Sequence, residues 1–142
     1  MAHGPAKMTL SSNAQNVLAA TVYEEARGEP KKGQTAVVHV IRNRVNANRE
    51  YWGGGTVEGV CLKEGQFECW NGRDVGGTIN QIKNTDDFRE IHCHVGNAWR
   101  MSDITQGSDH YNNPDKEGYP SWTKNCTKTM KIGNHQFYRS NC

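Results

Sequence analysis

The chain of 142 residues lacks several features that would place it in a broad class of protein. No apolar run approaches the length of a membrane span, which argues against stable insertion in a membrane. No run of Lys or Arg is present and the net charge is only +2, so nucleic acid is not an expected partner. Residues 1–12 are polar and contain no apolar segment like that of a secretory signal peptide. We therefore expect the protein to be made and folded in a cytosol.

The cysteines lack a CxxC pair and are odd in number. Together with cytosolic synthesis, this argues against a disulfide framework. We expect buried free thiols at Cys61, Cys69, Cys93, Cys126 and Cys142. His92-Cys93-His94 is typical of metal ligands, but on a helix residues i and i+2 point to different sides, and no second ligand pair has metal-site spacing. The sequence therefore predicts no metal and no other cofactor.

Length and composition predict one globular domain. A chain of this size can bury a core without disulfides or metals, and neither an internal repeat nor a low-complexity segment interrupts it. We expect residues 1–12 to form a short polar N-terminal tail and residues 13–142 to form a single domain.

Hydrophobic periodicity predicts three helices, at about residues 13–27, 32–46 and 85–100. The first should begin behind a capping box at residues 12–15 and end with Gly28 as its C-cap. Only a few residues separate it from the second helix, so the two should pack as a helical hairpin.

The rest of the chain is predicted to be irregular and then extended. Glycine pairs such as Gly76-Gly77 act as breakers within residues 49–84, which should hold a helical turn at 57–61 and a loop or short strand at 65–70. Residues 128–132 and 135–138 flank Gly133-Asn134, which predicts a β-hairpin. Helices followed by a small antiparallel sheet make the fold class α+β.

The segment YEEARGEP, at residues 23–30, contains the strongest candidate for a catalytic group. Leu18, Val22 and Glu25 are spaced i, i+4 and i+7, so they share one helix face. A carboxyl group withdrawn from water on such a face has a raised pKa and can hold the proton that a general acid needs. The alternative is a solvated last turn in which Glu25 pairs with an arginine.

Three blocks of the sequence resemble the spore-cortex-lytic (SleB-type) cell wall hydrolases. They are TVYEEARGEPKKGQTAVVHVIRNRV at residues 21–45, GVCLKEGQFECW at residues 59–70, and a third block from His110 through HYNN, PSW and IGNHQFYR. The resemblance implies a compact lysozyme-like domain, expected to be monomeric, that cleaves the glycan strands of peptidoglycan. It also implies that Glu25, which precedes Ala-Arg-Gly-Glu, is the catalytic acid.

One glutamate is enough if the 6-hydroxyl of N-acetylmuramic acid attacks its own anomeric carbon. We therefore favour a lytic transglycosylase that cleaves the β-1,4 bond from N-acetylmuramic acid to N-acetylglucosamine over a hydrolysing muramidase. Glu29, Glu68 and Asp109 are candidates for a second carboxylate. We expect Glu29 to cap the helix or to pair with Arg27 or Lys31 at the surface, and Glu68 to lie on the solvent side of a strand.

Four residues within the family blocks are expected to bind the substrate: Gln66, Phe67, Tyr111 and Trp122. Amides suit N-acetyl groups and aromatic faces suit sugar rings, although each of these side chains could equally be core or turn structure. Tyr23 is expected to pack against other side chains and to have no role in catalysis.

A short version of the family without a signal resembles a bacteriophage endolysin, which would act on the wall once the inner membrane is permeabilised. A non-catalytic peptidoglycan-binding module and a virion structural protein are the alternatives from other classes.

Overall fold

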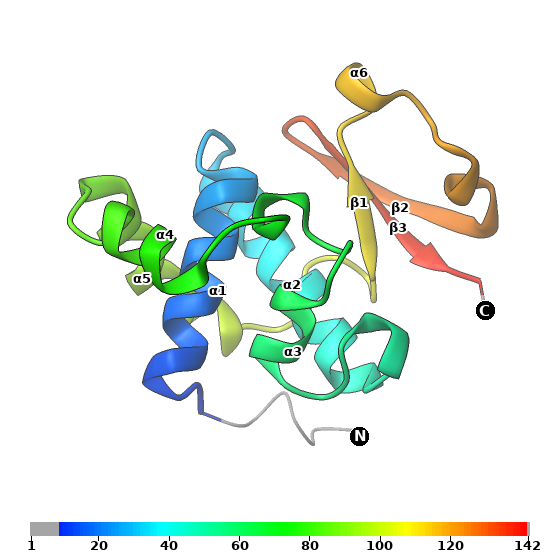
Figure 1. Ribbon diagram of the computed structural model, residues 1–142. Helices are drawn as coiled ribbons and strands as arrows, with labels where there is room; N and C mark the ends of the chain where they lie inside the picture. The colour runs from blue at the N-terminus through cyan, green and yellow to red at the C-terminus, as the bar shows by residue number, and fades with distance from the viewer. Residues whose placement is uncertain (1–8, 142) are drawn as a thin grey trace.

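The protein is described by a computed structural model for residues 9–141. The helices are α1 (Ser12–Ala26), α2 (Lys31–Ala47), α3 (Val57–Leu62), α4 (Val75–Ile82), α5 (Asp86–Trp99) and α6 (Pro114–Glu117). The strands are β1 (His110–Asn112), β2 (Cys126–Ile132) and β3 (His135–Ser140). Figure 1 shows α1 to α5 gathered on one side of the molecule and the small sheet with α6 on the other. The predicted α+β layout is confirmed.

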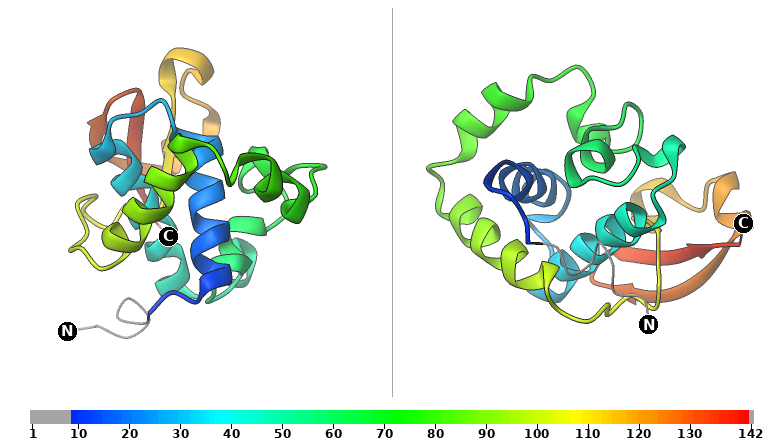
Figure 2. Two further views of the ribbon diagram at one scale, coloured as in Figure 1. Left: turned by 90° about the vertical axis from the view of Figure 1, so that its left-hand side faces the viewer. Right: turned by 90° about the horizontal axis from the view of Figure 1, so that it is seen from below.

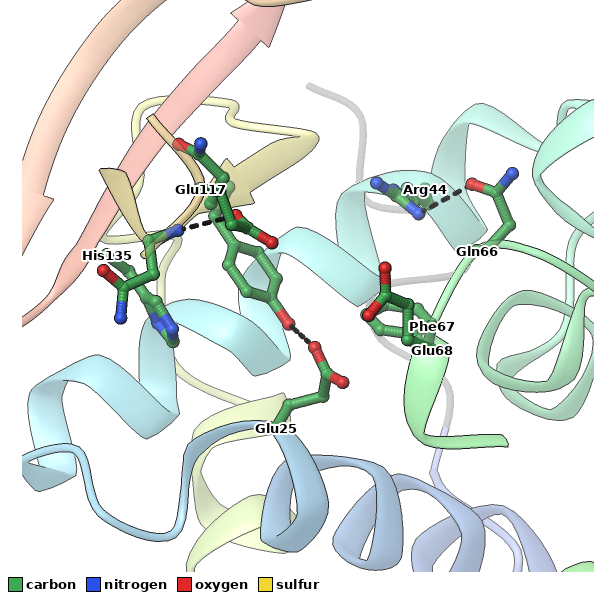
Figure 3. A pocket seen from close by; sticks show the side chains of 10 residues that line it. Glu25, Arg44, Gln66, Phe67, Glu68, Glu117 and His135 are labelled. Carbon is green, nitrogen blue, oxygen red and sulfur yellow. Dashed lines mark hydrogen bonds between the residues drawn. The ribbon is translucent and has the colours of Figure 1, made fainter. Parts of the chain in front are cut away.

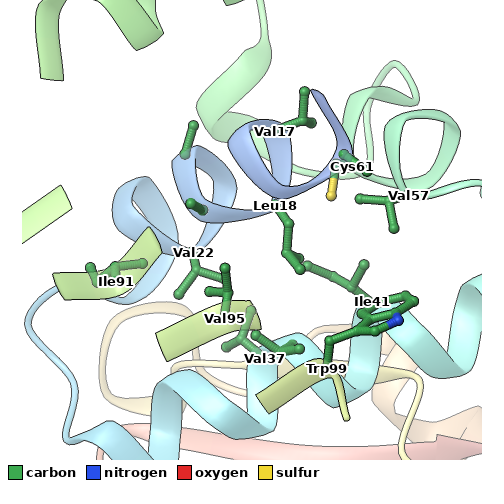
Figure 4. Close-up of a cluster of buried hydrophobic side chains, with 14 of the residues drawn as sticks. Val17, Leu18, Val22, Val37, Ile41, Val57, Cys61, Ile91, Val95 and Trp99 are labelled. Atoms are coloured by element: carbon green, nitrogen blue, oxygen red, sulfur yellow. The ribbon is translucent and has the colours of Figure 1, made fainter. Parts of the chain in front are cut away.

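Helix α1 runs through the centre of the helical part, and the view from below in Figure 2 shows it surrounded by α2 to α5. Its apolar face is the predicted one, since Leu18 and Val22 are completely buried. They pack with side chains of α2, α3 and α5, including Ile41, Cys61 and Val95 (Figure 4). Burial of these side chains is the main force that fixes the last turn of α1 in place.

The sheet is antiparallel with the strand order β1-β3-β2. It is joined to the helices by a second cluster of buried side chains, in which Ala36 and Val40 of α2 meet Ile132 and Phe137 of the β2–β3 hairpin. The predicted hairpin around Gly133-Asn134 is confirmed. Strand β1 was not predicted, because three residues are too few to show an alternating pattern.

The two ends of α1 differ in detail from the prediction. Ser11 is the N-cap and accepts a hydrogen bond from the Ala14 amide at 3.0 Å, so the capping box predicted at residues 12–15 is wrong. Gly28 is not a left-handed C-cap, since Arg27 occupies the C-cap in a right-handed conformation. The Ala26 carbonyl instead accepts hydrogen bonds from the Gln34 side chain and the Glu29 amide, which replace a glycine cap.

The middle of the chain is more helical than predicted. Helix α4 includes Gly76-Gly77, because Asp74 caps it by accepting from the Gly77 amide at 2.8 Å and Thr78 and Ile82 bury its inner face. Residues 68–70 form a 3₁₀ turn, so the alternative of a strand at 65–70 is wrong. The helical turn predicted at 57–61 is confirmed by α3.

The cysteines and the HCH tripeptide are distributed over the surface and the core. Cys61 is buried, but Cys93 is exposed, so the expectation that all thiols are buried is wrong. His92 contacts Asn16 and His94 contacts Thr35, which confirms that the two imidazoles point apart. The part of the chain that the structure describes contains no group of three or more side chains suited to a metal ion.

Two predictions concern residues that the structure does not describe: the free thiol at Cys142 and residues 1–8 of the expected N-terminal tail. Among residues 9–141, no helix combines the length and the apolar character needed to cross a membrane.

Candidate active site

A cavity of about 240 Å³ lies where the end of α1, the segment before the 3₁₀ turn at 68–70 and the sheet meet. Figure 3 shows Glu25 rising from its helix into this space, with His135 on one side and Arg44 and Gln66 on the other. Its lining residues come from separate parts of the chain: Glu25, Arg44, Gln66, Phe67, Glu68, Tyr111, Asn112, Asn113, Glu117 and His135.

Glu25 is held in this cavity by one short hydrogen bond. The Tyr111 hydroxyl donates to Glu25 Oε1 at 2.6 Å, and the Cys69 thiol also hydrogen-bonds to the carboxyl group. Burial raises the Glu25 pKa above its ordinary value of 4.5, the two hydrogen bonds lower it, and the charges of Glu68 and Glu117 raise it again. The raising effects dominate, so Glu25 keeps its proton to a higher pH than an exposed glutamate does.

The alternative interpretation of Glu25, a solvated turn paired with an arginine, is wrong. Arginine pairing falls instead to its neighbour Glu24, whose carboxylate lies 2.7 Å from Arg73 Nη1. Arg44 lines the same cavity as Glu25, but it donates hydrogen bonds to the Asp109 carbonyl and to Gln66 Oε1.

Tyr111 reaches Glu25 from β1, where it is paired in register with Phe137 of β3. Its ring packs against the ring of His135, with centroids 4.8 Å apart, and against that of Phe137 at 5.6 Å. Burial and the Glu25 charge raise the pKa of the phenol well above its usual range, so Tyr111 remains a hydrogen-bond donor.

Arg44 fixes the orientation of Gln66. The guanidinium is buried, lies 5.5 Å from the Phe67 ring centroid, and donates from Nη1 to Gln66 Oε1 at 3.2 Å. Because a guanidinium only donates, the Gln66 oxygen must face Arg44, and the two N–H groups of the amide remain available to another acceptor. Phe67 forms part of the same wall, with 4% of its surface exposed.

The three candidates for a second carboxylate have different positions. Glu68 lines the cavity from the 3₁₀ turn, so its expected place on a strand is wrong. Glu29 pairs with neither Arg27 nor Lys31; its two oxygens accept hydrogen bonds from the backbone and side chain of Asn134.

Asp109, the third of these candidates, does not line the cavity. Its carboxylate accepts hydrogen bonds from Ser140 and contacts His110 at 2.8 Å.

Trp122 is the predicted site residue that the structure leaves outside the cavity. It lies in the 3₁₀ turn at 121–125, against the rings of His110 and Tyr138, each 5.2 Å away. Gln66, Phe67 and Tyr111 do line the cavity with Glu25. Their roles in binding a substrate, and that of Trp122, stay predictions.

Sequence reasoning missed three charged or titratable residues of the cavity. Arg44 follows Val37 by seven residues and Val40 by four, so it interrupts the apolar face of α2, which is a signal that could have been used. His135 alternates with Phe137 on one strand face and was open to the same inference. Glu117 belongs to the short α6 and gave no signal.

Comparison with known proteins gives a consistent result. The family model of the cell wall hydrolases matches residues 28–138. The spore cortex-lytic enzyme of Bacillus subtilis (strain 168) is 33% identical over 127 residues, which are 89% of this chain and 38% of that protein. The corresponding enzyme of Oceanobacillus iheyensis is 32% identical over 89% of this chain and 42% of its own length. The chain thus spans about two fifths of the length of these curated relatives.

Two solved structures cover almost the whole chain. The catalytic domain of the germination-specific lytic transglycosylase SleB from Bacillus anthracis has a TM-score of 0.73 and 29% identity, over 98% of this chain and 100% of that one. The catalytic domain of Bacillus cereus SleB has a TM-score of 0.75 and 29% identity, over 97% and 98% of the two chains. The fold is therefore that of SleB catalytic domains, and the chain belongs to the cell wall hydrolase family.

Proposed function

We propose that this protein is a lytic transglycosylase that degrades peptidoglycan, with Glu25 as its single catalytic acid and base. The bond cleaved is the β-1,4 bond from N-acetylmuramic acid to N-acetylglucosamine. Membership of the cell wall hydrolase family and the likeness to SleB catalytic domains support the class of enzyme. The observation that carries the assignment to Glu25 is its place in the cavity, where burial raises its pKa and Tyr111 fixes its direction.

The reaction needs two proton transfers through one carboxyl group: Glu25 first gives up its proton and then receives another from the 6-hydroxyl. Protonated Glu25 donates to the glycosidic oxygen while the bond from that oxygen to the anomeric carbon breaks, and the N-acetylglucosamine chain leaves with the proton. The 6-hydroxyl of N-acetylmuramic acid then bonds to the anomeric carbon and gives its proton to the ionised Glu25. The product is a 1,6-anhydro sugar, no water is consumed, and the carboxyl group returns to its first state.

The neighbours of Glu25 suit this cycle. Tyr111 donates to the carboxylate form, so it supports Glu25 at the stage when the proton has left. The N–H groups of Gln66, directed by Arg44, suit an acceptor such as an N-acetyl carbonyl oxygen. These contacts would help to hold the sugar with its leaving oxygen toward Glu25.

A hydrolysing muramidase is the second candidate, and the presence of Glu68 and Glu117 in the same cavity favours it. Either carboxylate would have to activate a water molecule for attack on the anomeric carbon. One of the variants Glu68→Gln and Glu117→Gln should therefore abolish a hydrolase, whereas both should leave a transglycosylase active.

Mass spectrometry of digested muropeptides tests the proposal. We expect products lighter by one water than their hydrolysed counterparts, formed by the wild type and by the Glu68→Gln and Glu117→Gln variants. Products with reducing ends would establish the muramidase instead. A wall suspension that keeps its turbidity and yields no fragments would point to a binding module or a virion structural protein.

The setting proposed for this activity is lysis of a host cell by a bacteriophage, with the enzyme acting as a monomer. The proposed substrate, peptidoglycan, lies outside the inner membrane of such a cell. Cells that express the chain should stay intact until a pore-forming agent opens the inner membrane, and should then lyse rapidly. Lysis on expression alone would contradict this setting without affecting the proposed chemistry.

A further inference from the structure

Glu29 lies four residues after Glu25 and contacts the tip of the β2–β3 hairpin. Its Oε1 accepts a hydrogen bond from the Asn134 amide and its Oε2 accepts one from Asn134 Nδ2, both at 3.0 Å. Gly133, at φ +58°, packs so closely on this carboxylate that a Cβ there would collide with Glu29 Oε1. The turn and the carboxylate therefore fit each other through backbone as well as side chain.

The hairpin tip is connected to Glu25 by two further contacts. His135, the residue after Asn134, places its ring 4.8 Å from that of Tyr111. The hydroxyl of Tyr111 donates to Glu25 at 2.6 Å. A displacement of the turn would thus move the ring that supports Tyr111 and change the hydrogen bond to Glu25.

His135 is held by backbone pairing with Ile132 and by ring packing, and no side-chain hydrogen bond at Nδ1 adds to these contacts in the described residues. The residue is 7% exposed, and its buried Nδ1 has no hydrogen-bond partner among residues 9–141. The ring is therefore oriented by its packing against Tyr111 and Phe137, so its position depends on where the turn places the start of β3. The contact from Asn134 to Glu29 adds two directional hydrogen bonds at the residue next to His135.

We propose that Glu29 is a positioning residue of the candidate active site: its carboxylate anchors the β2–β3 turn, which holds His135 against Tyr111 and so directs Glu25. This inference rests on the proposed function, because the direction of Glu25 matters only if the carboxyl group transfers protons. Glu29 itself touches no reacting atom in this account.

The contact allows a charge-conserving exchange of donor and acceptor. In Asn134→Asp, two carboxylates face each other and the contact breaks. In the double variant Glu29→Gln/Asn134→Asp, the glutamine oxygen still accepts from the backbone amide and its N–H donates to the new carboxylate. The double variant has the formal charge of the wild type, so it separates geometry from electrostatics. Glu24→Gln is the matched control, since it removes a paired carboxylate in the last turn of α1, next to Glu25.

Two measurements are made on each variant. The first is kcat and its pH profile on glycan strands, and the second is the pKa of the Glu25 carboxyl group, measured by carbon-13 NMR without substrate. We expect Asn134→Asp to lower kcat roughly 10- to 100-fold, as small misplacements of catalytic groups do. Its Glu25 pKa should rise, because the Tyr111 hydrogen bond lowers that pKa and is weakened. Both values should return close to wild type in the double variant and stay unchanged in Glu24→Gln.

A double variant as impaired as Asn134→Asp, or an Asn134→Asp protein that matches the wild type in both readouts, would overturn the proposal. Failure of the proposed function has a different signature. In that case the wild type would release no anhydro products, whereas the Glu25 titration would still show whether the turn controls its surroundings.

Discussion

Two half-buried carboxyl groups, Glu25 and Asp109, lie close to β1, and their surroundings shift their pKa values in opposite directions. Glu25 points into the cavity at the inner side of the strand, where one hydroxyl and one thiol are its hydrogen-bond donors and two other carboxylates lie nearby. Asp109 directly precedes the strand and accepts hydrogen bonds from the backbone and side chain of Ser140 at 2.9 and 2.6 Å, with His110 at 2.8 Å.

Burial tends to raise the pKa at both positions, but only at Glu25 does it dominate. At Asp109 the hydrogen bonds of His110 and Ser140 outweigh burial and lower the pKa below its ordinary value of 3.8. The comparison shows that the hydrogen-bond donors around a carboxyl group, more than its burial, decide whether its pKa is raised or lowered. The ionised Asp109 carboxylate joins the start of β1 to the end of β3 through its hydrogen bonds with Ser140, whereas the raised pKa of Glu25 suits a proton donor.

Replacement of the proton donor, Glu25, should have the largest effect on activity. We expect Glu25→Gln to reduce lysis of a wall suspension by about 10²- to 10⁴-fold or more, the usual contribution of a general acid. The amide keeps the shape of the carboxyl group, so circular dichroism should show an unchanged fold. Glu24→Gln should retain most of the activity, and a folded Glu25→Gln protein with the wild-type rate would refute the assignment.

Removal of the Tyr111 hydroxyl, the hydrogen-bond donor to Glu25, should widen the difference in pKa between Glu25 and Asp109. In Tyr111→Phe the Glu25 pKa loses a hydrogen bond that lowers it, so the alkaline limb of the kcat/KM profile should move to higher pH. The ionised carboxyl group also loses support, and we expect kcat to fall roughly 10- to 100-fold. An alkaline limb that stays in place or moves to lower pH would show that Tyr111 does not control Glu25.

Neutralisation of the other carboxylate should affect stability and not chemistry. Asp109→Asn leaves the Ser140 donors without a charged acceptor, and we expect a loss in the free energy of unfolding on the order of 1–3 kcal/mol. Denaturant unfolding measures this loss, which should shrink as the pH falls through the depressed pKa of Asp109. Activity well below the unfolding temperature should persist; its disappearance would place Asp109 in the catalytic machinery.

The smallest effect concerns the stability of Glu25→Gln. A folded-state pKa above 4.5 means that the contribution of protonated Glu25 is complete below that pH and is lost as the pH rises through the raised pKa. The variant should therefore gain stability relative to the wild type on going from acidic to neutral pH. Thermal unfolding across this range would contradict the account if the wild type gained instead.

The sequence predicted one wall of the cavity better than the other. Leu18, Val22 and Glu25 lie on one helix, so local periodicity was enough to place the carboxyl group. Phe67 and Tyr111 came from the family resemblance, since nothing local joins residues that are far apart in the chain. The contact of Glu29 with Asn134, 105 residues away, depends on how the hairpin packs on α2, and no local pattern contains that information.

A carbon-13 NMR titration of the wild-type carboxyl groups tests the account at its base. The Glu25 resonance should titrate above 4.5 and the Asp109 resonance below 3.8, in the same sample and without substrate. Glu25 titrating at or below 4.5 would contradict the account, because the cavity would then hold a charge where the proposed reaction needs a proton.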